Sequence, residues 1–258
     1  MASINVNLKI NDKLYLRDPQ GTDLGRRIVQ NSIILIDEIG LDRFTFRKLA
    51  RRIKSTEASI YRYFENKHLL FVYLLNWYWE WMKFRVDFNT LNVDDPVRKL
   101  KIAISIIVDT ANRNTSIDFV DEDILHRIVV AEGTKGYHTK SVDAENRDGF
   151  FISYKMLCLK IADIMLEINP DFDYPRTLAS TLVETANNTI YFAQHLPRLT
   201  DIKYEGSHFH DNIIQMLEHL AFGALRAEEV AIRKTSSQIL NGYHITKDKS
   251  SPTRSLRH

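Results

Sequence analysis

Apolar residues at helical spacing, interrupted twice at short intervals, place the strongest constraint on how this sequence can fold. They recur every three or four positions in 28–36, again in 45–53, and a third time in 58–64. Gly40 ends the first set, and residues 54–55 separate the second set from the third. The pattern therefore predicts three helices joined by tight turns.

Residues suited to helix ends stand at these interruptions. Thr22 or Asp23 can begin the first helix and Thr56 the third, because their side-chain oxygens accept hydrogen bonds from free backbone N–H groups. A fourth helix, rich in aromatic residues, is predicted from 66–67 to about Phe88.

The remaining sequence continues the helical pattern. Nine glycines and six prolines are few for 258 residues, which favours long elements over a turn-rich β-sandwich. We therefore expect an all-α protein. Further helices are predicted at 96–113, 121–131, 148–168, 175–196 and 207–233, with a polar loop at 132–142.

The two ends of the chain differ from this pattern. Apolar and polar residues alternate in 4–10 and again in 14–16, on either side of an Asn-Asp turn, which predicts a small N-terminal β-hairpin. The last residues are polar and basic. We expect four parts: an extension at 1–21, a first helical domain at 22–70, a larger helical domain at 71–234 and a basic tail at 235–258.

Positive charge is concentrated in the first helical domain. Residues 22–70 contain ten Lys and Arg against six Asp and Glu, a net charge of +4, whereas the whole chain carries only +2. A basic module on a slightly acidic remainder is the pattern expected of a phosphate-binding surface. A solvated cationic helix surface would give the same count, so charge alone leaves both readings open.

The residues that could support catalysis are poorly placed for it. Cys158, the one cysteine, lies in an apolar helical stretch, which favours a buried structural thiol over a nucleophile activated by His126. His208 and His210 are two positions apart and so cannot share a helix face as metal ligands. We expect no enzymatic activity, no metal and no cofactor.

A membrane role is also disfavoured. The most apolar stretch, 69–88, contains four charged residues, and its aromatic residues occupy every side of the predicted helix. A helix that is apolar all round is usually buried, so we interpret it as the connector between the two domains. The first twenty residues have no apolar signal-peptide core, and we expect a cytoplasmic protein.

Several segments of the first domain share an order and spacing with one family. They are Ile36–Gly40, Phe44–Ala50, Ala58–Phe64, Asn66–Lys67 and Leu69–Leu70. Together they closely resemble the helix-turn-helix DNA-binding domain of TetR-type (tetracycline-repressor-like) regulators, over about Leu24 to Leu70. The resemblance implies a larger helical domain for ligand binding and dimerisation.

The function implied by this resemblance is that of a ligand-responsive transcriptional repressor. Such a protein binds a double-stranded DNA operator as a homodimer, with a possible small-molecule effector and without a membrane. The alternative is a helical protein-interaction module that keeps the fold without using DNA.

The resemblance also implies roles for individual residues. Phosphate contacts fall to Thr45, Tyr61 and Lys67, and base contacts to Arg47, Glu57, Ala58, Ser59 and Tyr63. The core of the domain is expected to contain Leu49, Ala50, Ile53, Ile60 and Phe64. Two positions depart from the family: Lys54 stands where a glycine usually provides a left-handed turn, and Glu57 brings a negative charge to the recognition helix.

Two sets of candidate residues lie in the larger domain. A ligand pocket is predicted from Trp77, Trp81, His126, Phe151, Tyr154, Asn187 and Tyr191, the alternative being a filled core. A dimer interface is predicted from Leu182, Ala186, Ile190, Ile213, Leu217, Leu220 and Ala224. The alternative for this second set is that both helices complete the core of one monomer.

Overall fold

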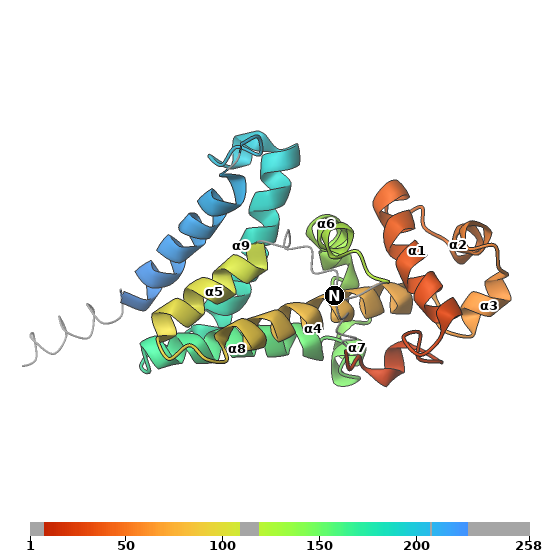
Figure 1. The fold of residues 1–258 in the computed structure, drawn as a ribbon, viewed down its shortest axis with the longest axis horizontal. Helices are drawn as coiled ribbons and strands as arrows, with labels where there is room; N and C mark the ends of the chain where they lie inside the picture. Colours follow the sequence, from red (N-terminus) through yellow and green to blue (C-terminus); the bar gives the residue numbers. More distant parts are fainter. Residues whose placement is uncertain (1–7, 109–118, 207, 227–258) are drawn as a thin grey trace, which may run out of the picture.

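The computed structural model describes residues 8–108, 119–206 and 208–226, and all regular elements in these ranges are helices. The prediction of an all-α fold is therefore confirmed. Figure 1 shows an elongated molecule with the first three helices at one end and a larger helical body at the other. The predicted segments 109–113 and 227–258 lie outside the described residues.

The first three helices begin and end close to the predicted positions. They are α1 (Asp23–Ile39), α2 (Phe46–Arg52) and α3 (Glu57–Tyr61). The hydroxyl groups of Thr22, Thr45 and Thr56 accept hydrogen bonds from backbone N–H groups in the first turns, which satisfies donors that a helix leaves unpaired. Gly40 ends α1 with a positive φ of 77°.

The turn between α2 and α3 requires a left-handed residue, and Lys54 provides it with a φ of 51°. Lys54 therefore has the left-handed backbone conformation that a glycine usually provides at this position, as expected. The backbone N–H of Ser55 donates to the carbonyl of Ala50 at 2.9 Å, which closes the turn. A side chain in this conformation costs about 1–2 kcal/mol relative to its ordinary backbone.

The second domain is built around one long helix. The helices that follow the turn are α4 (Lys67–Thr90), α5 (Pro96–Val108), α6 (Glu122–Glu132), α7 (Val142–Arg147), α8 (Ile152–Ile168), α9 (Pro175–His195) and a last helix at 209–226. Short 3-10 turns are η1 (Asp12–Leu14), η2 (Gly133–Gly136) and η3 (Pro197–Leu199). α8 packs against α4, α5 and α9.

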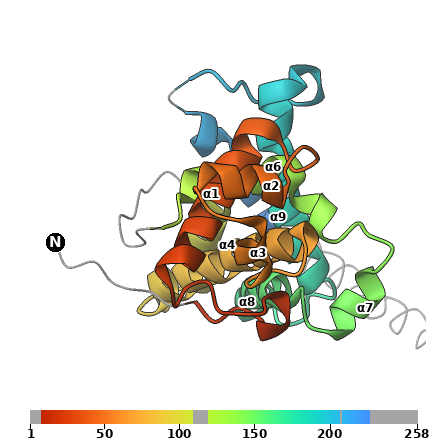
Figure 2. The same cartoon turned by 90° about the vertical axis from the view of Figure 1, so that its right-hand side faces the viewer.

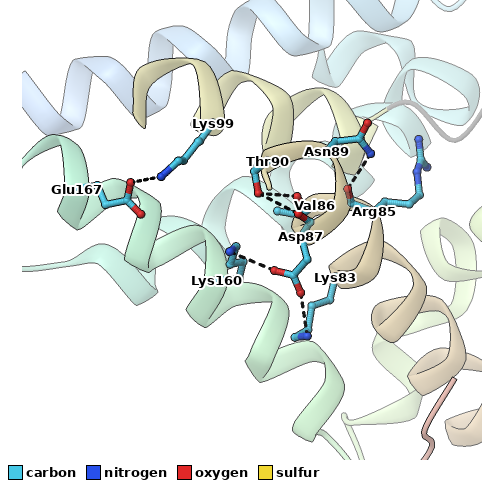
Figure 3. Close-up of polar contacts among 9 residues, drawn as sticks. All are labelled: Lys83, Arg85, Val86, Asp87, Asn89, Thr90, Lys99, Lys160 and Glu167. Atoms are coloured by element: carbon cyan, nitrogen blue, oxygen red, sulfur yellow. Dashed lines mark hydrogen bonds and ion pairs between the residues drawn. The ribbon is translucent and has the colours of Figure 1, made fainter. Parts of the chain in front are cut away.

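Helix α4 is buried along most of its length and on every side. Its buried residues include Trp77, Tyr78, Trp79 and Trp81. The aromatic stretch is therefore covered by other helices, as expected of a helix that is apolar on every side. Near its end, Asp87 pairs with Lys160 of α8 at 3.1 Å (Figure 3). Lys99 of α5 pairs with Glu167 of α8 at 2.5 Å in the same view.

The prediction of an N-terminal β-hairpin is wrong for the residues that the structure describes, which begin at residue 8. Residues 8–22 contain no strand, and the expected turn is the 3-10 helix η1. The reason is tertiary: Leu14 is buried, and the backbone N–H of Leu16 donates to the carbonyl of Tyr63 at 2.8 Å. The segment therefore pairs with the first domain instead of with itself. Residues 1–7 lie outside the described residues.

We expect substitutions at Lys54 to change stability according to their tolerance of a left-handed backbone. Lys54→Val should lower the free energy of unfolding by about 1–2 kcal/mol, because a β-branched residue tolerates positive φ poorly. Lys54→Gly should be at least as stable as the wild type. Urea denaturation measures both, and equal stability of the two variants would contradict the strained turn.

Candidate nucleic-acid interface

The start of α3 is exposed at the end of the molecule that faces the viewer in Figure 2. Glu57 and Ala58 are exposed and Ser59 is half-buried, while Ile60 is fully buried against the domain core. The predicted core residues Leu49, Ala50, Ile53 and Phe64 are also buried. The burial of Ile60 fixes which side of α3 turns outward, and that side contains the proposed base contacts.

Ser59 is already hydrogen bonded within the helix start. Its hydroxyl lies 2.9 Å from the hydroxyl of Thr56 and 3.4 Å from an amino group of Arg62. A hydroxyl has one proton and two lone pairs, so it can keep one of these bonds and still meet a base.

Helix α2 presents two predicted residues at its N-terminal end. Thr45 and Arg47 are both exposed. Thr45 caps the helix by accepting from the backbone N–H of Lys48 at 3.3 Å. Free backbone N–H groups and a positive helix end favour an anion at this position.

Tyr61 and Lys67 flank the end of α3. The Tyr61 ring is 48% exposed and packs edge-on against Phe46 at 5.0 Å, which leaves its hydroxyl accessible. Lys67, the first residue of α4, donates from Nζ to the carbonyl of Leu41 at 3.3 Å. Both side chains are therefore held against the domain in places from which they can reach a phosphate.

Tyr63 cannot contact a base, and this part of the prediction needs correction. Its side chain is 2% exposed, and its hydroxyl lies 2.8 Å from the hydroxyl of Thr22. Arg17 covers the ring at 5.5 Å from its centroid. Helix α3 ends at Tyr61, so Tyr63 turns inward and anchors the N-terminal segment instead of extending a recognition helix.

The basic residues of the domain divide into two groups. Arg27 donates to the carbonyl of Ile53, and Arg52 forms a two-bond ion pair with Glu38 at 2.5 and 2.9 Å. These side chains hold the helices together. The exposed residues that remain for phosphate are Arg43, Arg47, Lys48, Arg51, Lys54, Arg62 and Lys67. The charge count alone could not separate the two groups.

Polar contacts tie this domain to the second one. Arg127 of α6 forms a two-bond ion pair with Asp37 of α1, at 3.1 and 2.8 Å. Lys135 pairs with Asp42 at 3.0 Å. His68 lies 2.9 Å from Glu145 of α7. Sequence analysis did not identify these contacts, because each joins residues far apart in the chain.

A family model described as "Bacterial regulatory proteins, tetR family" matches residues 28–74, the segment that contains the whole surface described above. Residues 28–74 of the chain match this family, whose description names regulatory proteins.

Solved structures show the same fold beyond the matched segment. The fatty acid degradation regulator FadR from Bacillus halodurans has a TM-score of 0.55 at 15% identity, covering 78% of this chain and 95% of that one. A transcriptional regulator from Rhodococcus sp. Rha1 has a TM-score of 0.52 at 17% identity, with 82% and 97% covered. AibR, solved with isovaleryl coenzyme A and operator DNA, has a TM-score of 0.51 at 13% identity, with 76% and 97% covered. A comparison with curated protein sequences finds no match.

Catalysis, metal binding and membrane insertion were the other functions that the sequence raised. Burial raises the pKa of Cys158 to about 12, which keeps it a neutral thiol at pH 7. His126 lies 2.7 Å from the hydroxyl of Tyr78. Among the described residues, there is no group of three potential metal ligands, and none of the helices could cross a membrane.

Two of the predicted pocket residues, Phe151 and Tyr154, line a cavity beside α4. The other five do not line this cavity: Trp77, Trp81, His126 and Asn187 are buried, and Tyr191 packs against His195.

Most of the predicted dimer residues are also inside one chain. Leu182, Ala186, Ile190, Ile213 and Leu217 are buried in the single protomer. They complete its core, as the alternative interpretation held. Leu220 is 42% exposed and Ala224 is half-buried, so these two remain available to a partner.

A buried acid lies beside α4. Burial raises the pKa of Glu122 to about 7, against smaller lowering effects from the Trp81 indole and from Arg85. Burial also lowers the pKa of the neighbouring His126 to about 4, assisted by the positive charges around it. The two groups therefore change stability in opposite directions over the same range of pH.

We expect the Glu122→Gln variant to become more stable relative to the wild type as pH rises. Above its ordinary pKa of 4.5 the unfolded chain releases the Glu122 proton, whereas the folded protein keeps it until about pH 7. Native stability contributed by the neutral acid is thus lost between these values. Thermal melts of both proteins from pH 5 to 8 measure the difference, with exposed Glu205→Gln as control. A pH-independent difference would contradict the burial of Glu122.

We expect Lys67→Ala to weaken binding to all DNA sequences by a similar factor. The slope of log affinity against log salt should become flatter by about one unit, since one phosphate contact is lost. Fluorescence anisotropy over a salt series measures this slope. Lys140→Ala, an exposed change in the second domain, should leave it unchanged. Equal slopes for the wild type and Lys67→Ala would remove Lys67 from the phosphate contacts.

Proposed function

We propose that the chain is a sequence-specific DNA-binding repressor that acts as a homodimer and responds to a small molecule. The observation that carries this proposal is the exposed start of α3, bordered by exposed basic residues. In helix-turn-helix proteins the helix at this place enters the major groove.

Sequence choice is assigned to the outward side of α3 and to Arg47. Ala58 can contact a thymine methyl group, and Glu57 can accept from a cytosine amino group. Arg47 can pair with a guanine edge from the exposed start of α2. Because the Glu57 carboxylate also repels phosphate, Glu57 increases affinity only where it accepts from the cytosine amino group.

Phosphate contacts are assigned to Thr45, Tyr61 and Lys67. They lie at the start of α2, the end of α3 and the start of α4. Contacts at three helix ends fix the orientation of a domain on the duplex without reading its sequence.

The dimer surface is assigned to the exposed side of the last helix. Met216, Leu220 and Ala224 recur every four residues and are all at least partly exposed. The apolar side chains give a stripe that a second copy can cover around a two-fold axis. Two recognition helices would then occupy successive major grooves, about 34–36 Å apart.

Response to a small molecule is the remaining part of the proposal. AibR was solved with both an acyl coenzyme A and operator DNA, so that relative has room for both partners. For this chain, an effector inside the second domain would act on the helices that carry the recognition surfaces. The effector relieves repression if the effector-bound form fits the operator less well.

A selection from random duplexes should return a palindromic site for the wild-type protein. Ala58→Gln should change the preferred bases by about 1–3 kcal/mol per base pair while non-specific affinity survives. Arg47→Ala should lose affinity with an unchanged circular dichroism melt. A protein that binds no duplex above its non-specific affinity would favour the protein-interaction alternative.

We expect Leu220→Asp to give a folded monomer. Its side chain is largely outside the protomer core, so the new charge should disrupt a partner contact more than the fold. Sedimentation at micromolar concentration measures the assembly, and Leu91→Asp, at a leucine that is more exposed than Leu220, is the control. A wild-type protein that sediments as a monomer would remove the two-half-site mechanism.

A further inference from the structure

A cavity of about 380 Å³ lies in the second domain beside the first half of α4. Its walls come from α4, α7, α8 and α9. Two of its aromatic residues, Trp79 and Tyr154, stack with their ring centroids 4.6 Å apart and their planes at 26°. This volume lies within the range of small-molecule sites, about 300–1,000 Å³.

The polar groups in the inner part of the cavity are already hydrogen bonded. Asn76 donates to the carbonyls of Val72 and Phe150 at 2.9 and 2.7 Å, and it accepts from Ser153 at 2.9 Å. The hydroxyl of Tyr154 donates to Glu184 at 2.8 Å. The interior therefore offers mainly apolar and aromatic surface, which an apolar molecule can cover without breaking these bonds.

The polar groups at the mouth of the cavity differ from the inner ones because they are exposed to solvent. Asp143, Asn146 and Lys155 line it and are exposed to solvent. The ammonium group of Lys155 donates to the side-chain oxygen of Asn146. Among the described lining residues, Lys155 has the positive charge that an anionic group could meet while the rest of a ligand enters the interior.

Helix α7 is both a wall of this cavity and a link to the first domain. Val142 and Asn146 face the cavity. Glu145, between them, is 9% exposed and lies 2.9 Å from His68, the second residue of α4 and the neighbour of Lys67. Ser141 donates to the same carboxylate oxygen at 2.7 Å. A displacement of α7 would thus change a buried contact at the start of α4.

We propose that this cavity binds an apolar molecule with a carboxylate end, which pairs with Lys155, and that occupancy acts on α7 and the His68–Glu145 contact. The effect on DNA rests on the proposed function, whereas the binding does not. The chemistry follows from the division of the cavity into an apolar interior and a mouth that carries a lysine.

Binding is tested by calorimetry on the full chain with decanoate as the probe and decylammonium as its oppositely charged match. We expect decanoate to bind more tightly than decylammonium. Lys155→Met should weaken decanoate about tenfold, because a charge-assisted pair contributes about 1.4 kcal/mol. Lys140→Met, also exposed, should not change it. Tighter binding of decylammonium, or an unchanged affinity in Lys155→Met, would overturn the carboxylate assignment.

The position of the ligand is tested by filling the cavity. Ser180→Phe places a ring in the cavity from α9 and should abolish binding, whereas Ser180→Ala should retain it. Asn146→Trp obstructs the mouth at an exposed position, where the fold does not depend on the side chain, and should weaken binding at least tenfold. Decanoate that binds all three variants like the wild type occupies another place, and the proposal fails.

The coupling is tested on the duplex obtained by selection. In the wild type, saturating decanoate should lower DNA affinity by about 5–150-fold, the usual range of allosteric coupling. In Glu145→Gln the change should be less than twofold, with decanoate affinity retained. The exposed variant Glu205→Gln should behave as the wild type. An equal response in Glu145→Gln would overturn the route through α7.

The two proposals can fail separately. Decanoate binding that Ser180→Phe abolishes, in a protein that selects no duplex, would contradict the DNA-binding function and support the cavity. Selected DNA binding with no affinity for decanoate would support the function and contradict the ligand class.

Discussion

The burial of α4 on every side is the constraint on which the rest of the structure depends. The helix begins at Lys67 beside the recognition surface and ends at Thr90 between α5 and α8. Tyr73 packs against Phe64 with ring centroids 5.3 Å apart, and Trp77 is buried further along the helix. At about 1.5 Å per residue its 24 residues extend for about 36 Å. One helix thus contributes to a single hydrophobic core that runs through both parts of the molecule.

Local signals predicted the first domain well. Threonine caps, the glycine that ends α1 and the left-handed Lys54 each depend on a few neighbouring residues, and a sequence shows such residues directly. The direction of Tyr63 could not be predicted in this way. Its burial depends on Thr22 and on the N-terminal segment, which the chain brings to it across 41 positions. A neighbouring bond, from the backbone N–H of Leu16 to the carbonyl of Tyr63, explains why the alternating pattern near the N-terminus does not form strands.

The second domain was predictable as helices but not as sites. An apolar stripe on a helix indicates burial without saying whether the covering surface belongs to the same chain or to another. Leu217 and Leu220 were assigned to one interface, yet the protomer buries the first and exposes the second. Likewise, the aromatic residues of α4 differ in what they face. Trp79 lines the cavity because residues 133–150 pack beside it. The spacing of apolar residues along the sequence does not predict that arrangement.

The contacts between the two domains lie at several separated points: Asp37 with Arg127, Asp42 with Lys135, and Asp148 with Lys13 of the N-terminal segment. Asp148 directly follows α7, so the N-terminal segment is attached to both domains. Attachments at several places restrict the relative orientation of these parts more than a single connecting helix does. These pairs are largely exposed, and dissolved ions weaken exposed pairs. In the proposed complex with DNA, ionic strength would then act through two physical routes, the counterions of the duplex and the angle at which α3 is presented to it.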